Sequence, residues 1–221
     1  MTKVAIIPLL VPDVFGEDSL GCDIEVYSDD ATLADLLAAQ ERFAAAHLED
    51  CRGCDACCQE RAPLIAADIP ALYALLPPSP YPATSVCAAF ADIAVDKHGA
   101  ADICLRRHKS GACCQLDTQR HICREHSRRP FVCRSHFCLP RSDALASLRE
   151  QVINMGENAL VSLLLAEKAN GAPPLSDDDP LKRLYAEDYN ENPMSGRRNY
   201  AQIRICDCID RQLWQYIKKE G

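Results

Sequence analysis

Hydrophobic and polar residues alternate in two short runs near the start of the chain. These runs, residues 3–9 and 22–27, predict two strands joined by a loop that contains proline and glycine. Asp29 or Asp30 can then cap a helix over residues 32–49, whose large apolar side chains recur near one face at helical spacing. This helix leads the chain directly into a cluster of cysteines.

The middle of the chain is punctuated by proline and glycine. Asp68 can start a short helix with Pro70 in its first turn, and the proline-rich segment 77–82 after it predicts a loop. Residues 92–107 predict a β-hairpin with its turn near Gly99. The second strand of this hairpin leads into a basic, cysteine-rich segment.

The C-terminal third begins with the longest helical pattern. Ser142 can cap a helix over residues 143–170 that ends at Gly171, and Gly156 inside it indicates a kink or a break. The remaining pattern predicts three shorter elements, which are a helix over 179–189, a strand over 200–206 and a last helix that begins after Asp207.

These elements predict an α+β fold, a mostly helical single domain with short strands around an irregular, metal-organised cysteine-rich core. Residues 1–48 supply the N-terminal strands and helix that pack on this core. Residues 49–141 form the core itself, and residues 142–221 form a helical cover with a C-x-C element. Aromatic residues make up only 6% of the chain, so packing around large rings is not the main organising force.

Fourteen of the 221 residues are cysteines, so the redox compartment decides what they do. The apolar run from Val4 to Val11 is short for a signal peptide and lacks a small-x-small cleavage site. No apolar stretch approaches the roughly 20 residues of a membrane helix. We therefore expect a cytoplasmic protein without a membrane partner, whose reduced thiols bind metal. The even number of cysteines leaves a disulfide-stapled secreted domain as the alternative.

The first cysteine cluster has the spacing C-x-x-C-x-x-C-C. It contains Cys51, Cys54, Cys57 and Cys58. Two residues between thiols let a tight turn aim both sulfurs at one point, as in zinc and iron-sulfur sites. Adjacent side chains diverge in a helix or a strand, so we expect Cys57 and Cys58 to ligate two different irons or two sites. This pair favours a polynuclear centre over a single zinc ion.

The second group of cysteines lies in a strongly basic segment. Between Ile103 and Arg141 nine basic residues face two acidic ones, a net charge of +7 in a chain whose total is −8. Thiolates around a metal need nearby donors and positive charge, and Arg124, Arg129 and Arg134 are the candidates for that second shell. A solvated basic face or a nucleic-acid patch is the alternative, but no aromatic residues are interleaved for single-strand binding.

Three motifs together resemble the YkgJ-type cysteine-cluster family, whose members are described as zinc- or iron-chelating. The first is the C-x-x-C-x-x-C-C cluster, and the second is G-x-C-x-x-L-D from Gly111 to Asp117. The third is Cys123 followed by R-P-x-x-C-R from Arg129 to Arg134. The resemblance covers residues 49–138 and implies a metal- or cluster-binding core. Cys114 and Cys138 depart from the family pattern.

The predicted cofactor ligands are eight cysteines of these two groups, namely Cys51, Cys54, Cys57, Cys58, Cys113, Cys123, Cys133 and Cys138. Cys114, Cys206 and Cys208 are further candidates. With Cys138 they could extend the ligand set to eight or more cysteines, enough for two four-cysteine sites. Three other cysteines stand in strand or loop settings and are expected to pack in the core, and these are Cys22, Cys87 and Cys104. The six histidines show no ligand spacing.

Three hypotheses of different classes follow. The first is a protein with one or two [4Fe-4S]-type iron-sulfur clusters for electron transfer, redox sensing or cluster handling, with a protein redox or metal-delivery partner. The second is a structural zinc module that binds a protein. The third is an enzyme in which a cluster with an open iron site is the reactive centre. No phosphate loop, dinucleotide fingerprint or H-E-x-x-H helix gives an enzyme assignment an anchor, and the sequence leaves the oligomeric state open.

Overall fold

The fold was analysed from a computed structural model, which describes residues 2–12, 18–48, 54–136 and 138–220. The chain divides into two compact units, each of which is built from separate stretches of sequence. The first unit contains residues 1–50, 134–152 and 200–221, and the second contains residues 51–133 and 153–199. Helices and short two-stranded sheets occur together, which confirms the predicted α+β class.

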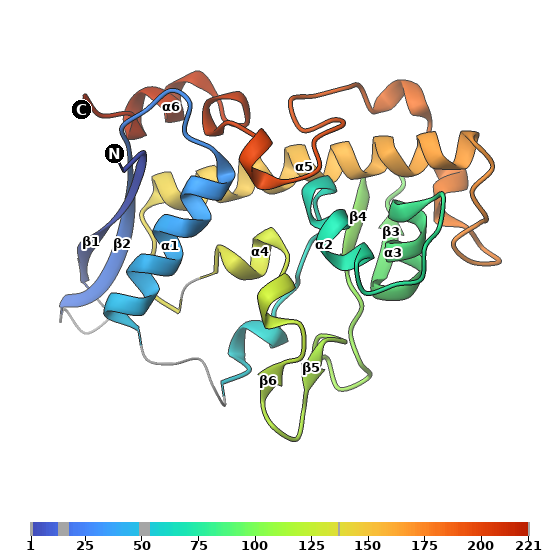
Figure 1. Ribbon diagram of the computed structural model, residues 1–221, viewed down its shortest axis with the longest axis horizontal. Helices are drawn as coiled ribbons and strands as arrows, with labels where there is room; N and C mark the ends of the chain where they lie inside the picture. The colour runs from blue at the N-terminus through green and yellow to red at the C-terminus, as the bar shows by residue number, and fades with distance from the viewer. Residues whose placement is uncertain (1, 13–17, 49–53, 137, 221) are drawn as a thin grey trace. The chain divides into compact units, whose positions relative to one another are not determined.

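The first unit opens with the predicted strand pair, drawn in blue in Figure 1. Strand β1 (Val4–Pro12) runs antiparallel to β2 (Asp18–Val26), with Val4 opposite Val26 and Ile6 opposite Ile24. Both strands are longer than the alternation predicted. Alternate side chains of β2 are buried because successive residues of a strand point to opposite faces.

Helix α1 (Leu33–His47) confirms the predicted helix but not its cap. The cap is Thr32, because the hydroxyl of Thr32 accepts a hydrogen bond from the Asp35 amide at 3.3 Å. The Asp35 carboxylate in turn accepts one from the Thr32 amide at 2.9 Å. This reciprocal arrangement is a capping box, so the assignment of the cap to Asp29 or Asp30 was wrong.

The second unit contains the predicted short helix and hairpin. A 3-10 turn, η2 (Ala66–Asp68), leads into α2 (Ile69–Tyr73). Strands β3 (Ala91–Val95) and β4 (Ala101–Leu105) pair around a turn in which Gly99 has a φ of 83°. The positive φ explains why glycine occupies this turn.

The sequence does not predict helix α3 (Pro82–Phe90), because its first residue belongs to the proline-rich segment 77–82, whose pattern predicts a loop. Proline is well tolerated at the first helical position. The carboxylate of Glu167, which is buried, accepts hydrogen bonds from the amides of Ala83 at 3.0 Å and Thr84 at 2.8 Å. The cap of α3 therefore comes from a residue far away in the sequence.

Helix α5 (Asp143–Ala169) is the long predicted helix, capped by Ser142, whose hydroxyl accepts from the Leu145 amide at 3.1 Å. The predicted break at Gly156 is wrong, because the helix runs through this position without interruption. A Cβ atom on Gly156 would lie only 2.5 Å from the Cβ atom of Ile65. Close packing inside the second unit accounts for the glycine.

The C-terminal segment differs most from its prediction. The expected helix over 179–189 is two 3-10 turns, η4 (Pro180–Arg183) and η5 (Ala186–Asp188). The expected strand over 200–206 is also wrong, because 3-10 turns η6 (Tyr200–Gln202) and η7 (Ile205–Asp207) occupy it. The last helix is confirmed as α6 (Arg211–Ile217), with Asp210 as its cap.

The false strand signal has a physical reason. Ile203 and Ile205 are both buried, as alternate residues of a strand would be. The carbonyl of Ile203 accepts from the Leu33 amide at 2.9 Å, and the Ile205 amide donates to the Ala31 carbonyl at 2.9 Å. The segment thus follows an extended path at that point only, between two turns.

The cysteine-rich part of the second unit has little regular structure. Its elements are short, and they are η1 (Ala56–Gln59), β5 (Leu116–Asp117), β6 (Ile122–Cys123), η3 (His126–Arg128) and α4 (Phe131–Arg134). Backbone pairing and single side chains hold these pieces together.

Candidate metal centre

The first cysteine cluster ends in the 3-10 turn η1. Cys51 lies outside the described residues, and Cys54 is exposed. Cys57 and Cys58 are half-buried, and a hydrogen bond from the Cys58 thiol lowers the pKa of Cys57 to about 6. The same bond, together with burial, raises the pKa of Cys58.

The expectation that the side chains of Cys57 and Cys58 diverge is therefore wrong. Consecutive Cα atoms are only about 3.8 Å apart, so a choice of rotamer can bring two neighbouring sulfurs together although the Cβ atoms point apart. The inference that an adjacent pair must serve two different metals loses its geometric basis.

The second cysteine segment is joined to the first by its backbone. The amide of Cys113 donates to the carbonyl of Cys58 at 2.9 Å. Cys113 is buried, and a hydrogen bond from the Cys114 thiol lowers its pKa to about 7. The amide of Gln115 also lies 3.5 Å from the Cys113 sulfur. These donors favour a thiolate at Cys113.

The third segment contributes Cys123 and Cys133. Cys123 pairs with Leu116 across strands β5 and β6, which places it in register with the second segment. Cys133 lies in α4, and burial first, then the Cys113 thiolate, raise its pKa. Five thiols from three segments thus act electrostatically on one another, and they are Cys57, Cys58, Cys113, Cys123 and Cys133.

A buried carboxylate positions the helix that carries Cys133. Asp68 is only 1% exposed. One of its oxygens accepts from the amide of Phe131 at 2.8 Å, and the other accepts from the amide of Ile65 at 2.8 Å. The local sequence pattern predicts only a helix start at Asp68, because it carries no sign of a partner 63 residues away.

The three predicted second-shell arginines have different surroundings. At Cys57 the positive charge of Arg129 adds to the hydrogen bond from Cys58 that lowers the pKa. At Cys123 burial raises the pKa, and the charge of Arg129 opposes that rise. The pKa of Asp117 is lowered first by a hydrogen bond from the Arg120 amide, and the charge of Arg124 adds to this effect. Arg134 belongs to the first unit, where its guanidinium lies 2.7 Å from the carboxylate of Glu41.

A fourth arginine, Arg107, was not among the second-shell candidates. Its charge contributes to the lowered pKa of Cys113, and its guanidinium donates to the carbonyls of Gln59 and Gly111. It therefore ties the first two cysteine segments together. The only signal for it in the sequence was its place in the basic segment.

A histidine and an aspartate make a further link between cysteine segments. The Nδ1 atom of His121 lies 2.9 Å from the carboxylate of Asp55. His121 has a φ of 52°, a conformation that is uncommon outside glycine. The β5–β6 turn and the first cluster are thereby connected through side chains.

The remaining candidate thiols belong to the first unit. Cys138 is exposed. The thiol of Cys206 donates to the carbonyl of Asp29 at 3.4 Å, and that of Cys208 donates to the carbonyl of Arg204 at 3.3 Å. Cys22, expected in the core, is buried and donates to the carbonyl of Pro140 at 3.6 Å. None of the cysteines that the structure describes is in a disulfide.

The donor set suits a thiophilic metal. Among residues 2–12, 18–48, 54–136 and 138–220, no group of three or more side chains of cysteine, histidine, aspartate or glutamate is placed to hold a metal ion. Cys51 lies outside these ranges. The five interacting thiols are soft donors, and Arg107 and Arg129 offset their negative charge. Mutual repulsion among the thiolates is the cost that a bound cation would remove.

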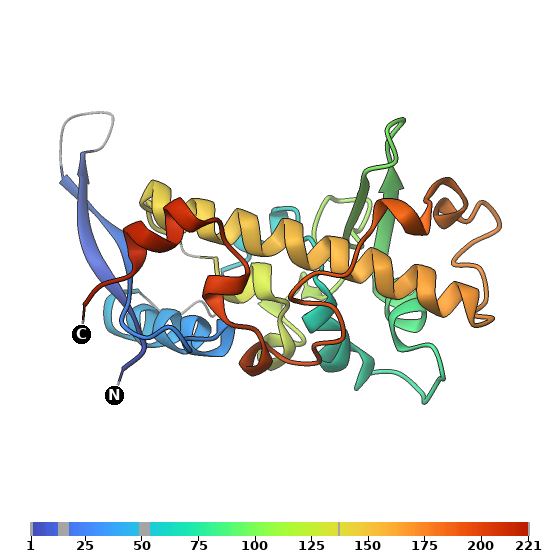
Figure 2. The ribbon, with the colours of Figure 1, turned by 90° about the horizontal axis from the view of Figure 1, so that it is seen from above.

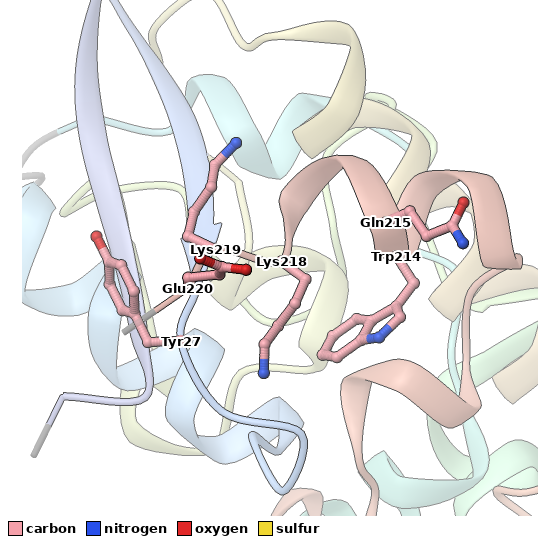
Figure 3. Close-up of a pocket in the computed structure, with 6 residues that line it drawn as sticks. All are labelled: Tyr27, Trp214, Gln215, Lys218, Lys219 and Glu220. Atoms are coloured by element: carbon pink, nitrogen blue, oxygen red, sulfur yellow. The ribbon is translucent and has the colours of Figure 1, made fainter.

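A cavity of about 540 Å³ in the first unit contains no cysteine. Figure 3 shows the indole of Trp214 and the side chain of Lys218 in this cavity, with Tyr27 farther along it. Lys218 is already paired, since its Nζ atom lies 2.7 Å from the carboxylate of Asp29. The chemistry of this cavity therefore differs from that of the thiols.

None of the helices described is both long and apolar enough to cross a membrane.

Comparisons with known proteins agree with the cysteine motifs. Residues 50–153 match the family model CxxCxxCC, which is described as "Putative zinc- or iron-chelating domain". The match extends beyond the predicted resemblance into the first turns of α5. No curated protein matches the chain. No solved structure matches it either. Residues 50–153, a little under half of the chain, thus match the model of the CxxCxxCC family, as the motifs predicted.

Proposed function

We propose that the chain is an iron-sulfur protein, which holds one or two [4Fe-4S]-type clusters by cysteine thiolates and works in electron transfer, redox sensing or cluster handling. The observation that carries the proposal is the convergence of five thiols from three segments, and Cys51 and Cys54 precede Cys57 closely in the sequence. A single tetrahedral zinc ion uses four ligands, so this supply of thiols exceeds what one zinc needs.

The positive groups around the thiols support a cluster with a tuned potential. Charge and hydrogen bonds near cluster sulfurs are levers that set reduction potentials. Arg129 acts on two of the thiols, and Arg107 acts on a third. A reducing compartment such as the cytoplasm would keep these thiols available, and the partner would be a protein redox or metal-delivery partner.

A structural zinc module is the second candidate. Its support is the contact between Cys57 and Cys58, which removes the geometric reason for assigning that pair to two metals. In that case the zinc would stabilise the second unit, and the function would lie in a protein-binding surface. An enzyme with an open iron site would need one cluster iron without a cysteine ligand.

Anaerobic purification followed by absorption spectroscopy and by iron, sulfide and zinc analysis tests the proposal. A brown protein with broad absorbance near about 400 nm and acid-labile sulfide is expected. A colourless protein with stoichiometric zinc would overturn it in favour of the zinc module. Spectra recorded with added small ligands then separate a fully ligated cluster from one with an open iron.

Serine substitutions test the number of sites. Cys58→Ser is expected to reduce metal content, whereas Cys138→Ser and Cys206→Ser reduce it only if a second site exists. Cys87→Ser is a control outside the predicted ligand set, because Cys87 is a buried thiol of the second unit that is only 2% exposed. If none of the three substitutions lowers metal content, only one small site exists.

A further inference from the structure

The turn η1, which carries Cys57 and Cys58, ends in two backbone carbonyls that are held by residues 106–114. The last carbonyls of a helical turn have no partner within the turn and need donors from elsewhere. The carbonyl of Cys58 accepts from the amide of Cys113 at 2.9 Å. The carbonyl of Gln59, the next residue, accepts from the guanidinium of Arg107. One backbone donor and one side-chain donor thus attach the first cysteine segment to the second.

Residues 106–114 form a loop that closes on itself. The loop follows strand β4, which is drawn in green in Figures 1 and 2. The amide of Cys114 donates to the carbonyl of Arg106 at 2.8 Å. Next to this bond, Arg107 and Cys113 pair in an isolated antiparallel bridge. The backbone of Arg107 is therefore fixed relative to the residue that carries the Cys113 thiol.

The tip of the same loop explains the glycine that begins the second motif. Gly111 has a φ of 89°, in the left-handed region that other residues rarely adopt. In this conformation its carbonyl accepts from the Nε atom of Arg107. A Cβ atom on Gly111 would lie 3.7 Å from the Nη2 atom of Arg107, an ordinary contact distance. The backbone conformation, and not a lack of space, therefore calls for glycine here.

One guanidinium group thus reaches a carbonyl of each cysteine segment. Its Nε atom bonds two residues before Cys113, and its Nη2 atom bonds one residue after Cys58. Arginine presents its N–H donors in one rigid plane, whereas the ammonium of lysine is a point charge on a flexible stem. The rigid plane of Arg107 therefore fixes the spacing of two backbone segments that carry thiols.

Two neighbouring arginines have a different role. Arg106 also donates to carbonyls, but these belong to α3 and to the first residue of β3. Arg129 donates to the carbonyl of His126, within its own segment. The charge of Arg107 also contributes to the lowered pKa of Cys113, after the hydrogen bond from the neighbouring thiol. Arg107 thus joins two ligand-bearing segments and places a positive charge near one of their thiols.

We infer that Arg107 is a positioning residue of the metal centre, a clamp that holds the segments of Cys58 and Cys113 in place around a bound metal. It acts through the backbone of these segments and is not itself a ligand. Outer-shell partners of metal ligands change metal affinity by about 10–100-fold. The inference rests on the proposed function only in that these thiols hold a metal, and it is the same for zinc and for an iron-sulfur cluster.

Co²⁺ is the probe, because it binds the same ligands as zinc and ferrous iron and its bonds to thiolates absorb light. Competition with a chromophoric chelator, under anaerobic and reducing conditions, measures its affinity for the full chain. Arg107→Gln removes the fork of donors and the charge. Because Arg107 is exposed, its effect should lie at the lower end of the range, an affinity about tenfold weaker than wild type.

The matched control is Lys109→Gln. Lys109 lies in the same loop and is exposed, so this change removes one positive charge without touching the clamp. Its affinity for Co²⁺ should equal that of wild type. Arg107→Lys keeps the charge but loses the planar fork, and it should still bind Co²⁺ more weakly than wild type.

Hydrogen exchange of the Co²⁺-loaded proteins separates a local clamp from a general loss of stability. The Cys113 amide, which donates to the carbonyl of Cys58, should exchange faster in both Arg107 variants than in wild type. The Leu105 amide, which donates to the carbonyl of Ala62, should exchange as in wild type. Equal acceleration of both amides would show a general destabilisation and would overturn the inference.

The remaining outcomes are decided by the affinities. Wild-type affinity in Arg107→Gln or in Arg107→Lys would overturn the inference, and so would an equal loss in Lys109→Gln. If Arg107→Gln does not fold around the metal, the affinity and the Cys113 exchange of Arg107→Lys decide. A wild-type chain without cobalt–thiolate absorption would instead contradict the proposed function, and the inference would fail with it.

Discussion

In the first unit, Cys22 and Cys208 are buried one at a time, and each thiol donates to a backbone carbonyl of that unit. In the second unit, five thiols converge and interact mainly with one another. Burial raises the pKa of Cys22 to about 11 and that of Cys208 to about 12, so both stay protonated near neutral pH. Hydrogen bonds from neighbouring thiols instead lower the pKa of Cys57 and Cys113.

The contrast divides the described cysteines into two chemical settings. A thiol that already has a carbonyl acceptor and an apolar shell is a small hydrophobic side chain. A thiol whose neighbours are other thiols receives little stabilisation from the protein and would receive much from a bound cation. Metal removal should therefore affect the two groups in opposite ways.

The largest expected effect is that of metal removal. Chelation under reducing conditions is expected to unfold residues 49–138, because metal binding supplies folding free energy, about 10 kcal/mol or more in small zinc domains. Circular dichroism and the thermal midpoint measure the loss. An alkylating reagent should then modify Cys57 and Cys113 but leave Cys22 and Cys208 unmodified. A metal-free protein with an unchanged spectrum and midpoint would refute this prediction.

The next largest effect is expected from Asp68→Ala. This change leaves the buried amides of Ile65 and Phe131 without their acceptor, which we expect to lower the free energy of unfolding by about 3 kcal/mol. Asp68→Asn keeps one acceptor oxygen and should cost clearly less. Urea denaturation of the metal-loaded protein measures both. Equal stability of Asp68→Ala and wild type would mean that the bound metal, and not the Asp68 hydrogen bonds, fixes the position of Cys133.

A smaller effect is expected from Gly156→Ala. The added methyl group would meet the Ile65 side chain at 2.5 Å, and overpacking of this kind costs about 1–3 kcal/mol. The higher helix propensity of alanine, worth about 1 kcal/mol, offsets part of that cost. Asn154→Ala, on an exposed position of the same helix, is the control and should be neutral or stabilising. A higher thermal midpoint for Gly156→Ala than for wild type would show that the backbone can shift at this position.

Regular periodicity predicted the regular elements. Strands β1 and β2, helix α1 and most of α5 follow from residues that repeat every two or every three to four positions. What escaped prediction depends on partners distant in the sequence. The cap of α3 is Glu167, and the fixed position of α4 depends on Asp68.

The candidate site could be predicted only in part, for a similar reason. The motif spacing identified the matched domain over residues 50–153. It did not reveal that the carbonyl of Cys58 accepts a hydrogen bond from the amide of Cys113, nor that Arg107 bridges two cysteine segments. Such contacts are set by the folded path of loops, and loops carry no periodic signal. Spacing alone also does not predict the hydrogen bond between the neighbouring thiols of Cys57 and Cys58, because that contact depends on their rotamers.

The smallest expected effect concerns the carboxylate that holds the outer edge of β4. Glu157 accepts from the Ile103 amide at 2.6 Å, but burial raises its pKa above the ordinary 4.5. The folded state therefore binds this proton more tightly than the unfolded state does. The contribution of Glu157 to stability is complete below about pH 4.5 and is lost as the pH rises through its folded pKa.

Glu157→Gln tests this pH dependence of stability without removing the hydrogen bond, because the amide oxygen of glutamine can still accept from the Ile103 amide. The variant should be slightly more stable than wild type at pH 8 and should lose the decline in stability just above pH 4.5. Urea denaturation of both proteins at a series of pH values gives the comparison. Since the second unit also depends on its thiols, the metal content must be matched at each pH. A variant whose stability falls with rising pH as steeply as wild type would show that another group is responsible.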